Sequence, residues 1–197
     1  MDIQKTILDF NNLFYSLSQF TWDNTTYFGY KVWKNPLDMW IMQEIICEVK
    51  PDVIIETGTF MGGSAFFYAH ILDQLNHGRI ITIDITDRPN RPEHERIKYI
   101  TSNSDNINLI DVLDISTKKV LVILDSDHST EHVMRELEIY APLVSIGSYI
   151  VVEDTNIGLP LIAVQKFLET NTNFIVDRSR EKYLCTFNPS GYLKRVK

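Results

Sequence analysis

The sequence predicts an α/β fold: a mostly parallel, seven-stranded sheet with helices on both faces and an antiparallel hairpin at the C-terminus. From residue 51 to residue 168, short apolar runs alternate five times with segments of helical periodicity. Such alternation is typical of parallel strands joined by crossover helices. Two further apolar runs, FIVDRS (residues 174–179) and KYLCTF (182–187), flank a short charged turn and indicate a hairpin at the far edge of the sheet. The first of the five alternating strands runs into a glycine-rich turn, which is the usual ligand-binding position of such sheets.

The first 50 residues read as a cover over this sheet. Residues 5–17 have the apolar spacing of an amphipathic helix. Residues 19–36 are dense in aromatic side chains without a clean period, which fits either a loop packed by its rings or a lid over a pocket. Asp38 is a plausible N-cap for a helix that Pro51 ends. We therefore expect one domain over residues 1–197, made of an N-terminal cover (1–50) and a catalytic core (51–197).

The core elements follow in order along the chain. A buried strand at residues 53–55 leads through the glycine-rich turn into a helix that Ser64 opens and that ends near Gly78. The remaining expected strands are RIITIDI (79–85), IKYIT (97–101), KKVLVILDSDHS (118–129) and SYIVVEDTN (148–156), and the remaining expected helices are residues 107–115, 130–140 and 159–168.

Composition narrows the function classes. The chain has 197 residues and a formal net charge of -7, which disfavours nucleic-acid or anionic-membrane partners because both need a basic surface. Cys47 and Cys185 both lie in apolar segments and are expected to be reduced core thiols. The N-terminus lacks a signal-peptide pattern, and no apolar stretch approaches the roughly 20 residues of a membrane span, so we expect a cytoplasmic protein without membrane insertion.

The glycine-rich turn has the pattern E-T-G-T-F-M-G-G-S rather than G-x-G-x-x-G. Together with acidic residues after the next two strands, this pattern resembles the class I S-adenosylmethionine (SAM)-dependent methyltransferases. Glu56 suits the ammonium group of SAM, Asp84 suits the ribose hydroxyls, and Asp105 suits the adenine amino group. Gly58 would let the backbone pass close to the ligand. The full set of expected cofactor-binding residues is Glu56, Gly58, Thr59, Phe60, Gly62, Gly63, Ser64, Asp84, Ser104 and Asp105.

Two other interpretations of this set stay open. A nicotinamide dinucleotide is the alternative ligand. The residues could also be purely structural, with Glu56 capping a helix, Asp84 ending a strand and the glycines only making turns.

Acidic residues also end the fourth and fifth strands, in the runs DSDH (125–128) and EDTN (153–156). Burying several carboxylates at neighbouring strand ends is costly unless a cation compensates them. Mg²⁺ bound by carboxylates, waters and substrate oxygens is the expected compensation. The structural alternative is that Asp127 or Ser129 caps a helix while Glu153 and Asp154 are solvated.

Four segments carry a more specific resemblance: NPLDMWIMQE (35–44), KPDVIIETGTFMGGSA (50–65), LDSDHS (124–129) and SYIVVEDT (148–155). Together they resemble the cephalosporin hydroxylase / rhamnosyl O-methyltransferase family. The resemblance implies a class I methyltransferase sheet, SAM and Mg²⁺ as cofactors, and Asp127, Glu153 and Asp154 as metal ligands. A wider similarity to catechol-type O-methyltransferases could equally select Asp125, so the choice between Asp125 and Asp127 stays open.

The predicted activity is Mg²⁺-assisted O-methylation of a hydroxyl on a small molecule or sugar moiety. Asp127 and His128 are the candidate catalytic residues. His128 could accept the proton, support the site or only start a helix, and Asp127 or metal-bound hydroxide could accept the proton instead. The alternatives are a hydroxylase-type oxidoreductase and a non-catalytic SAM-fold binding module. The sequence shows no obvious 2-His-1-carboxylate cluster among its histidines, His70, His77, His94, His128 and His132. The identity of the acceptor and any homo-oligomer are left open by the sequence.

Overall fold

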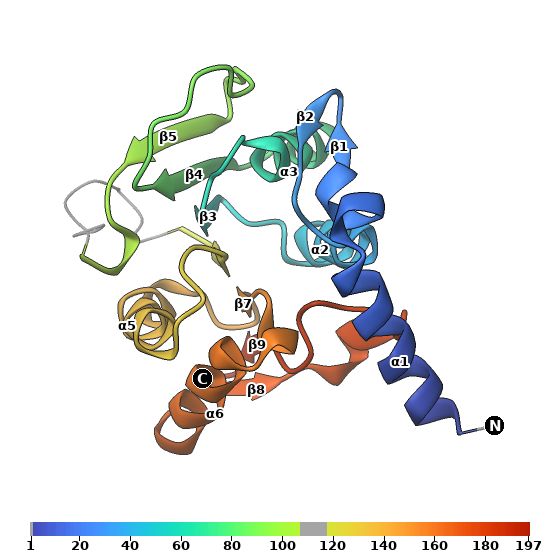
Figure 1. Cartoon of the computed structure of the whole chain (residues 1–197). Coiled ribbons are helices and arrows are strands. Elements are labelled where there is room, and N and C mark those ends of the chain that lie inside the picture. The colour runs from blue at the N-terminus through green and yellow to red at the C-terminus, as the bar shows by residue number, and fades with distance from the viewer. Residues whose placement is uncertain (1, 107–117) are drawn as a thin grey trace.

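The computed structural model describes residues 2–106 and 118–197. Its seven-stranded sheet has the order β5-β4-β3-β6-β7-β9-β8, and β1 and β2 form a separate two-stranded ribbon (Figure 1). The described helices are α1 (Ile3–Ser16), α2 (Pro36–Val49), α3 (Gly63–Leu75), α5 (Thr130–Tyr140) and α6 (Leu159–Thr170). The strands are β1 (Thr26–Tyr27), β2 (Tyr30–Lys31), β3 (Val53–Thr57), β4 (Arg79–Asp84), β5 (Ile97–Thr101), β6 (Val120–Leu124), β7 (Tyr149–Val152), β8 (Phe174–Val176) and β9 (Tyr192–Arg195).

The register of the sheet brings four strand ends to one level. Thr57 at the end of β3 pairs with Ile83 of β4 and with Leu124 of β6. Leu124 in turn pairs with Val152, the last residue of β7. The residue that follows each of these strand positions therefore emerges at the same edge, as parallel strands require.

Alternating side chains of the buried strands build two cores on opposite faces of the sheet. On one face, Ile54 packs in a buried cluster with residues of α2 and α3. On the other face, Val53 and Ile55 pack in a cluster with residues of α5 and α6. Because the core strands are apolar on both faces, they read in the sequence as continuous apolar runs.

The start of α2 differs from the expectation. Asn35, not Asp38, is the N-cap, because its side chain accepts a hydrogen bond from the Leu37 amide and Pro36 occupies the first helical turn. Asp38 lies inside the first turn and is buried, where it accepts hydrogen bonds from the Phe187 amide and the Tyr192 hydroxyl. Asp38 therefore ties α2 to the C-terminal part of the chain.

The antiparallel pair at the end of the chain is present, but its second strand was wrongly placed. β9, which pairs antiparallel with both β7 and β8, is Tyr192–Arg195 rather than residues 182–187. The KYLCTF segment instead contacts the N-terminal cover: Lys182 pairs with Glu44, and Phe187 packs against the ring of Trp22. Its apolar residues are used in that contact, so apolarity alone did not distinguish it from a strand.

Two further expectations can be compared with the described residues, and a third cannot. The predicted helix at residues 107–115 lies outside them. Cys185 is buried and Cys47 half-buried, and both are free thiols. Among the helices in the described ranges, none has the length and apolarity needed to cross a membrane. The cytoplasmic location stays a prediction.

Candidate active site

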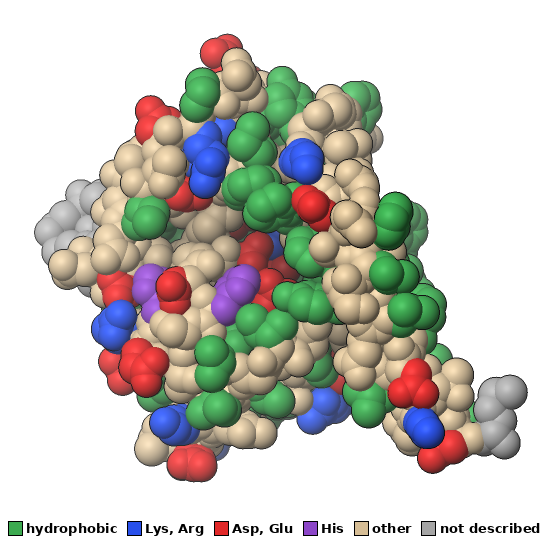
Figure 2. All heavy atoms as spheres, in the orientation of Figure 1, with side chains coloured by type: hydrophobic (Ala, Val, Ile, Leu, Met, Phe, Trp, Pro, Cys, Tyr) green, Lys and Arg blue, Asp and Glu red, His purple; other side chains and the backbone are tan. Residues whose placement is uncertain are grey.

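A cavity of about 710 Å³ opens at the carboxyl ends of the central strands. Figure 2 shows this hollowed face, where acidic and histidine side chains gather near its middle. Gly58, Asp84, Asp125 and Asp154 reach the cavity from four strand ends. Tyr15 of α1 and two tryptophans of the N-terminal cover, Trp22 and Trp33, form an aromatic wall. The cover thus supplies both a packed loop and part of the pocket lining.

Backbone hydrogen bonds fix the strand ends that carry these side chains. The Gly58 amide donates to the Ile83 carbonyl, and the Asp125 amide donates to the Thr57 carbonyl. A side chain on Gly58 would bring its Cβ to 1.7 Å from the Asp125 carbonyl oxygen, and Gly58 has a φ of +82°. The glycine is therefore needed for close approach between β3 and the end of β6. The sequence had assigned this freedom to contact with a ligand.

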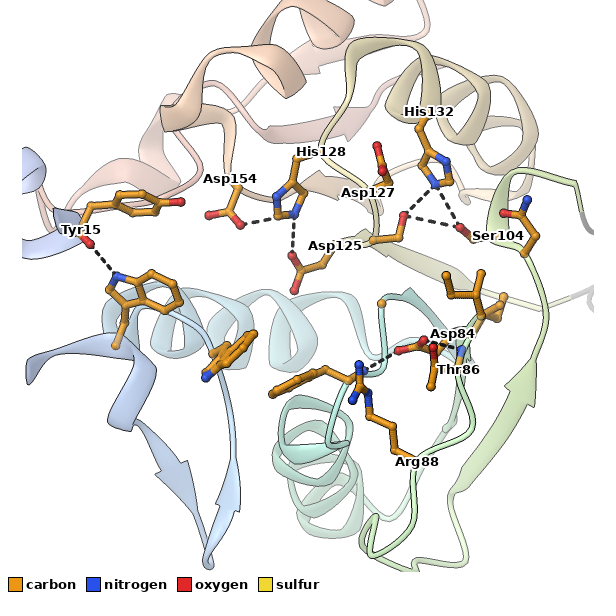
Figure 3. A pocket seen from close by; sticks show the side chains of 18 residues that line it. Tyr15, Asp84, Thr86, Arg88, Ser104, Asp125, Asp127, His128, His132 and Asp154 are labelled. Atoms are coloured by element: carbon orange, nitrogen blue, oxygen red, sulfur yellow. Dashed lines mark hydrogen bonds and ion pairs between the residues drawn. The ribbon is translucent and has the colours of Figure 1, made fainter. Parts of the chain in front are cut away.

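Asp84 is held rigidly at the cavity wall. Its Oδ2 accepts a hydrogen bond of 2.8 Å from the Phe60 amide, and its Oδ1 accepts one of 2.8 Å from the Thr86 amide (Figure 3). The Phe60 ring stacks on Trp33 with 4.1 Å between ring centroids. A fixed carboxylate beside an aromatic surface is suited to a hydroxyl-bearing ligand with a flat base.

The predicted cofactor residues divide into two groups. Gly58, Phe60, Asp84 and Ser104 line the cavity, whereas Glu56, Thr59, Gly62, Gly63, Ser64 and Asp105 are not among its lining residues. Glu56 is fully buried, and its two oxygens accept hydrogen bonds from the Ser64 and Thr82 hydroxyls at 2.6 and 2.7 Å. Asp105 pairs with Arg135 at 2.6 Å. Their ligand roles remain predictions, and the geometry gives both side chains structural partners.

The acidic strand ends enclose a lysine that no motif in the sequence singles out. Lys34 Nζ lies 2.6 Å from Asp125 Oδ2, with which it forms a hydrogen bond, and 2.8 Å from Glu153 Oε1. The contact with Glu153 is an ion pair without hydrogen-bond geometry. Lys34 is only 4% exposed. The sequence signal was a lysine immediately before the N-P pair, inside an otherwise aromatic segment.

On the cavity side, Asp125, His128 and Asp154 form a group whose ligand atoms lie within 4.8 Å of one another. His128 Nε2 is 3.4 Å from Asp125 Oδ1 and 3.4 Å from Asp154 Oδ2, as Figure 3 shows. This nitrogen is buried and has no hydrogen-bond partner among the described residues. Asp154 has a positive φ of 54°, a sparsely populated conformation for a non-glycine residue that places it at the cavity.

Burial and neighbouring charges shift the ionisation of this group. Burial alone would raise the pKa of Asp125, but Lys34 and then His128 hold it below its ordinary value. Burial raises the pKa values of Glu153 and Asp154. Burial lowers the pKa of His128, but the adjacent Asp125, with Asp154 and Glu153, outweighs it and raises this pKa to about 8. His128 therefore carries a proton at neutral pH in this arrangement.

Asp127 lies outside that group. It is exposed, and its Oδ1 accepts a hydrogen bond of 2.8 Å from the Ser129 amide at the start of α5. It does line the cavity. Of the predicted metal ligands, Asp154 belongs to the group with Asp125 and His128. Glu153 instead contacts Lys34, and Asp127 lies outside the group. Between Asp125 and Asp127, the geometry favours Asp125 as a metal ligand. The set of metal ligands stays a prediction.

The structure also brings two histidines and one carboxylate together, which the sequence had not made visible. His70, Asp73 and His94 have ligand atoms within 4.8 Å of one another. Both Asp73 oxygens are paired, one with Arg96 Nε at 2.6 Å and one with His94 Nε2 at 3.0 Å. His94 Nδ1 accepts a hydrogen bond of 3.1 Å from the Arg96 amide. The ring proton of His94 is therefore on Nε2, the nitrogen that faces the Asp73 carboxylate. These bonds form an ion-paired network between α3 and the loop that joins β4 to β5.

Five parallel strands, the antiparallel β9 between β7 and β8, and a cavity at the strand ends define a class I methyltransferase fold. The chain belongs to the family described as rhamnosyl O-methyltransferase/CmcI, whose model matches residues 19–196. The family, the fold class and the prediction of a methyltransferase-type enzyme are thereby confirmed.

Relatives in this family cover most of the chain. A rhamnosyl O-methyltransferase of Mycobacterium bovis is 34% identical and matches 88% of this chain and 79% of its own length. A rhamnosyl O-methyltransferase of Mycobacterium leprae is 32% identical, matching 89% of this chain and 85% of its own.

Solved structures agree on the fold. CmcI with Mg and SAM has a TM-score of 0.70 at 19% identity, covering 89% of this chain and 78% of that chain. The O-methyltransferase NovP has a TM-score of 0.58 at 14% identity, covering 84% and 82%.

Proposed function

We propose that this chain transfers the methyl group of SAM to a hydroxyl of a sugar moiety, with Mg²⁺ held at the acidic strand ends. The observation that carries the proposal is one continuous cavity, lined by Asp84 on one side and by Asp125, His128 and Asp154 on the other. The mycobacterial relatives are rhamnosyl O-methyltransferases. Their similarity supports a sugar, and specifically a rhamnosyl group, as the first acceptor to test.

The Asp84 side of the cavity fits SAM. The Phe60 and Thr86 amides orient the Asp84 carboxylate, and its remaining lone pairs can accept hydrogen bonds from two vicinal ribose hydroxyls. Ser104 and the Phe60 ring add a hydroxyl and an apolar surface to the same wall. When bound, SAM supplies an electrophilic methyl group whose transfer leaves a neutral thioether.

The Asp125 side fits a hard divalent cation. Asp125 Oδ1 and Asp154 Oδ2 both approach His128 Nε2, and that nitrogen is buried without a hydrogen-bond partner in the part of the chain that the structure describes. Mg²⁺ prefers oxygen ligands, so the two carboxylates would hold it, and His128 would stand beside them. When bound there, Mg²⁺ lowers the pKa of a hydroxyl and orients its oxygen.

The chain's own residues then position the acceptor and handle its proton. Tyr15, Trp22 and Trp33 present rings against which the apolar face of a sugar can pack. His128 is the candidate proton acceptor at this end of the cavity, but it must first lose the proton that Asp125 and Asp154 hold on it. Its role as a base therefore depends on compensation of those two carboxylate charges.

The proposal is tested with purified protein, SAM and a rhamnosyl glycoside carrying free hydroxyls. We expect formation of S-adenosylhomocysteine and of a product heavier by one methyl group, loss of both on chelation with EDTA, and recovery on addition of Mg²⁺. The same glycoside with all hydroxyls methylated is the matched control. Product formation that EDTA leaves unchanged contradicts the metal assignment, and failure to bind SAM contradicts the cofactor assignment.

A further inference from the structure

Tyr15 reaches the cavity from α1, in the N-terminal cover, and its ring is held on two sides. The ring stacks on Trp22 with 5.5 Å between ring centroids, and the Phe187 ring meets it edge-on at 5.0 Å. The Trp22 indole Nε1 also donates a hydrogen bond of 3.0 Å to the Tyr15 carbonyl oxygen. Because Phe187 is only 4% exposed, the phenol ring rests against the buried interior of the protein. These contacts fix the direction of the Tyr15 side chain.

The hydroxyl of Tyr15 is the free end of this fixed ring. Figure 3 shows the ring directed toward Asp154, at the end of the cavity that also holds Asp125 and His128. The hydroxyl has no hydrogen-bond partner in residues 2–106 and 118–197. Burial, and after it the charges of Asp154 and Asp125, raise the pKa of Tyr15, so the phenol keeps its proton at neutral pH. It is therefore available as a hydrogen-bond donor.

The space between Tyr15 and Asp154 suits an alcohol. Tyr15 offers a donor and Asp154 an acceptor, and the two side chains face each other without a hydrogen bond between them. An alcohol hydroxyl can accept a hydrogen bond from the phenol and donate one to the carboxylate at the same time. On a vicinal diol, one oxygen held at the acidic strand ends brings the adjacent hydroxyl to the same end of the cavity.

We infer that Tyr15 is a specificity-determining residue: its hydroxyl donates a hydrogen bond to the acceptor hydroxyl next to the one that is methylated. The inference rests on the proposed function and narrows its substrate class to acceptors with two adjacent free hydroxyls. Asp154 accepts a hydrogen bond from the same neighbouring hydroxyl, so the acceptor is fixed at two adjacent oxygens. Attachment at two points orients the reacting oxygen toward SAM and selects which hydroxyl reacts.

Tyr15→Phe separates this role from packing. The variant keeps the ring contacts with Trp22 and Phe187 and loses only the donor, and urea denaturation checks that it is folded. Tyr27→Phe is the matched control, because Tyr27 is in the same cover but its hydroxyl is hydrogen-bonded to His70 at 3.0 Å and does not line the cavity. The control should leave both acceptor binding and turnover unchanged.

Acceptor binding without turnover is measured by calorimetry with Mg²⁺ and S-adenosylhomocysteine, which has no methyl group to transfer. The first probe is a rhamnosyl glycoside with free hydroxyls. The others are deoxy glycosides, each lacking one hydroxyl next to the position that is methylated in the wild-type product. We expect Tyr15→Phe to bind the first probe roughly tenfold more weakly than wild type does, and to bind one deoxy glycoside equally well. A folded Tyr15→Phe that binds the first probe as wild type does overturns the inference.

Turnover of the same glycosides gives the second readout. Wild type should prefer the glycoside with free hydroxyls over that deoxy glycoside by at least roughly tenfold in kcat/KM, and Tyr15→Phe should reduce this preference roughly tenfold. The affinity for SAM should be unchanged. The wild-type comparison needs no variant, so wild type that methylates every deoxy glycoside as fast as the first probe overturns the inference alone, as does an equal preference in the two proteins. A wild-type chain that methylates no rhamnosyl glycoside overturns the proposed function, and the inference falls with it.

Discussion

Lys34 Nζ lies 2.6 Å from Asp125 Oδ2, so the N-terminal cover places a positive charge directly on the central acidic strand end. From the sequence, only a divalent cation is expected to compensate the buried acids. The lysine supplies part of that compensation from within the chain, with Glu153 as its second partner. The acids are therefore not all equivalent candidates for metal binding.

Asp125 and Asp127 should differ sharply in their effect on methyl transfer. Asp125→Asn removes charge from the group with His128 and Asp154, and we expect at least a roughly 100-fold loss of kcat/KM. Asp127→Asn keeps an oxygen that can accept the hydrogen bond from the Ser129 amide. We therefore expect kcat/KM to fall by no more than roughly threefold. Rates with saturating SAM measure both effects, and calorimetry checks that SAM binding survives. The reverse order of losses would make Asp127 the metal ligand.

Glu56 and Asp84 should separate stability from cofactor binding. Asp84→Ala removes the carboxylate at the cavity wall, and we expect SAM binding to weaken at least roughly tenfold. Glu56→Ala removes the buried carboxylate that accepts hydrogen bonds from the Ser64 and Thr82 hydroxyls, so we expect the free energy of unfolding to fall by about 2–4 kcal/mol. Its SAM affinity should remain near wild type at temperatures where it is folded. A folded Glu56→Ala that no longer binds SAM would restore the ammonium role predicted from the sequence.

The sequence could predict the sheet because its strands are buried on both faces and read as apolar runs. It could also predict that Asp84, Asp125 and Asp154 would line one cavity, because each lies at the end of a strand at the same edge of the sheet. It could not place Lys34, whose partners lie 91 and more residues away along the chain. The last strand was misplaced for a similar reason, since residues 182–187 are apolar for contact with the cover rather than for pairing in the sheet.

Gly58→Ala should lower the free energy of unfolding by much more than the left-handed backbone conformation at this position alone explains. The new Cβ would lie 1.7 Å from the Asp125 carbonyl oxygen, so the ends of β3 and β6 must separate. We expect a loss of at least about 3 kcal/mol in the free energy of unfolding, measured by urea denaturation. Gly147→Ala is the matched control, with a φ of +81° and no atom of residues 2–106 or 118–197 within 4 Å of its Cβ, and should cost about 1 kcal/mol. Equal losses in the two variants would mean that the close approach to Asp125 has no energetic weight.

Asp38 should make the stability of the fold fall as pH rises. Burial raises the pKa of this carboxyl to about 6, despite the hydrogen bonds it accepts from Phe187 and Tyr192. Its ordinary pKa of 3.8 applies to the unfolded chain, so between these two values the folded state holds a proton that the unfolded state has released. The stabilisation from this proton is complete below about pH 4 and is lost as pH rises through about 6, a change of about 3 kcal/mol.

Other buried acids also titrate, so the measurement is the difference in free energy of unfolding between wild type and Asp38→Asn, by urea denaturation at several pH values. Asparagine cannot ionise, and the variant should therefore gain stability relative to wild type from pH 4 to pH 7. A difference that stays constant over this range would mean that Asp38 is ionised in the folded protein throughout, with Lys34 or the two hydrogen bonds outweighing its burial.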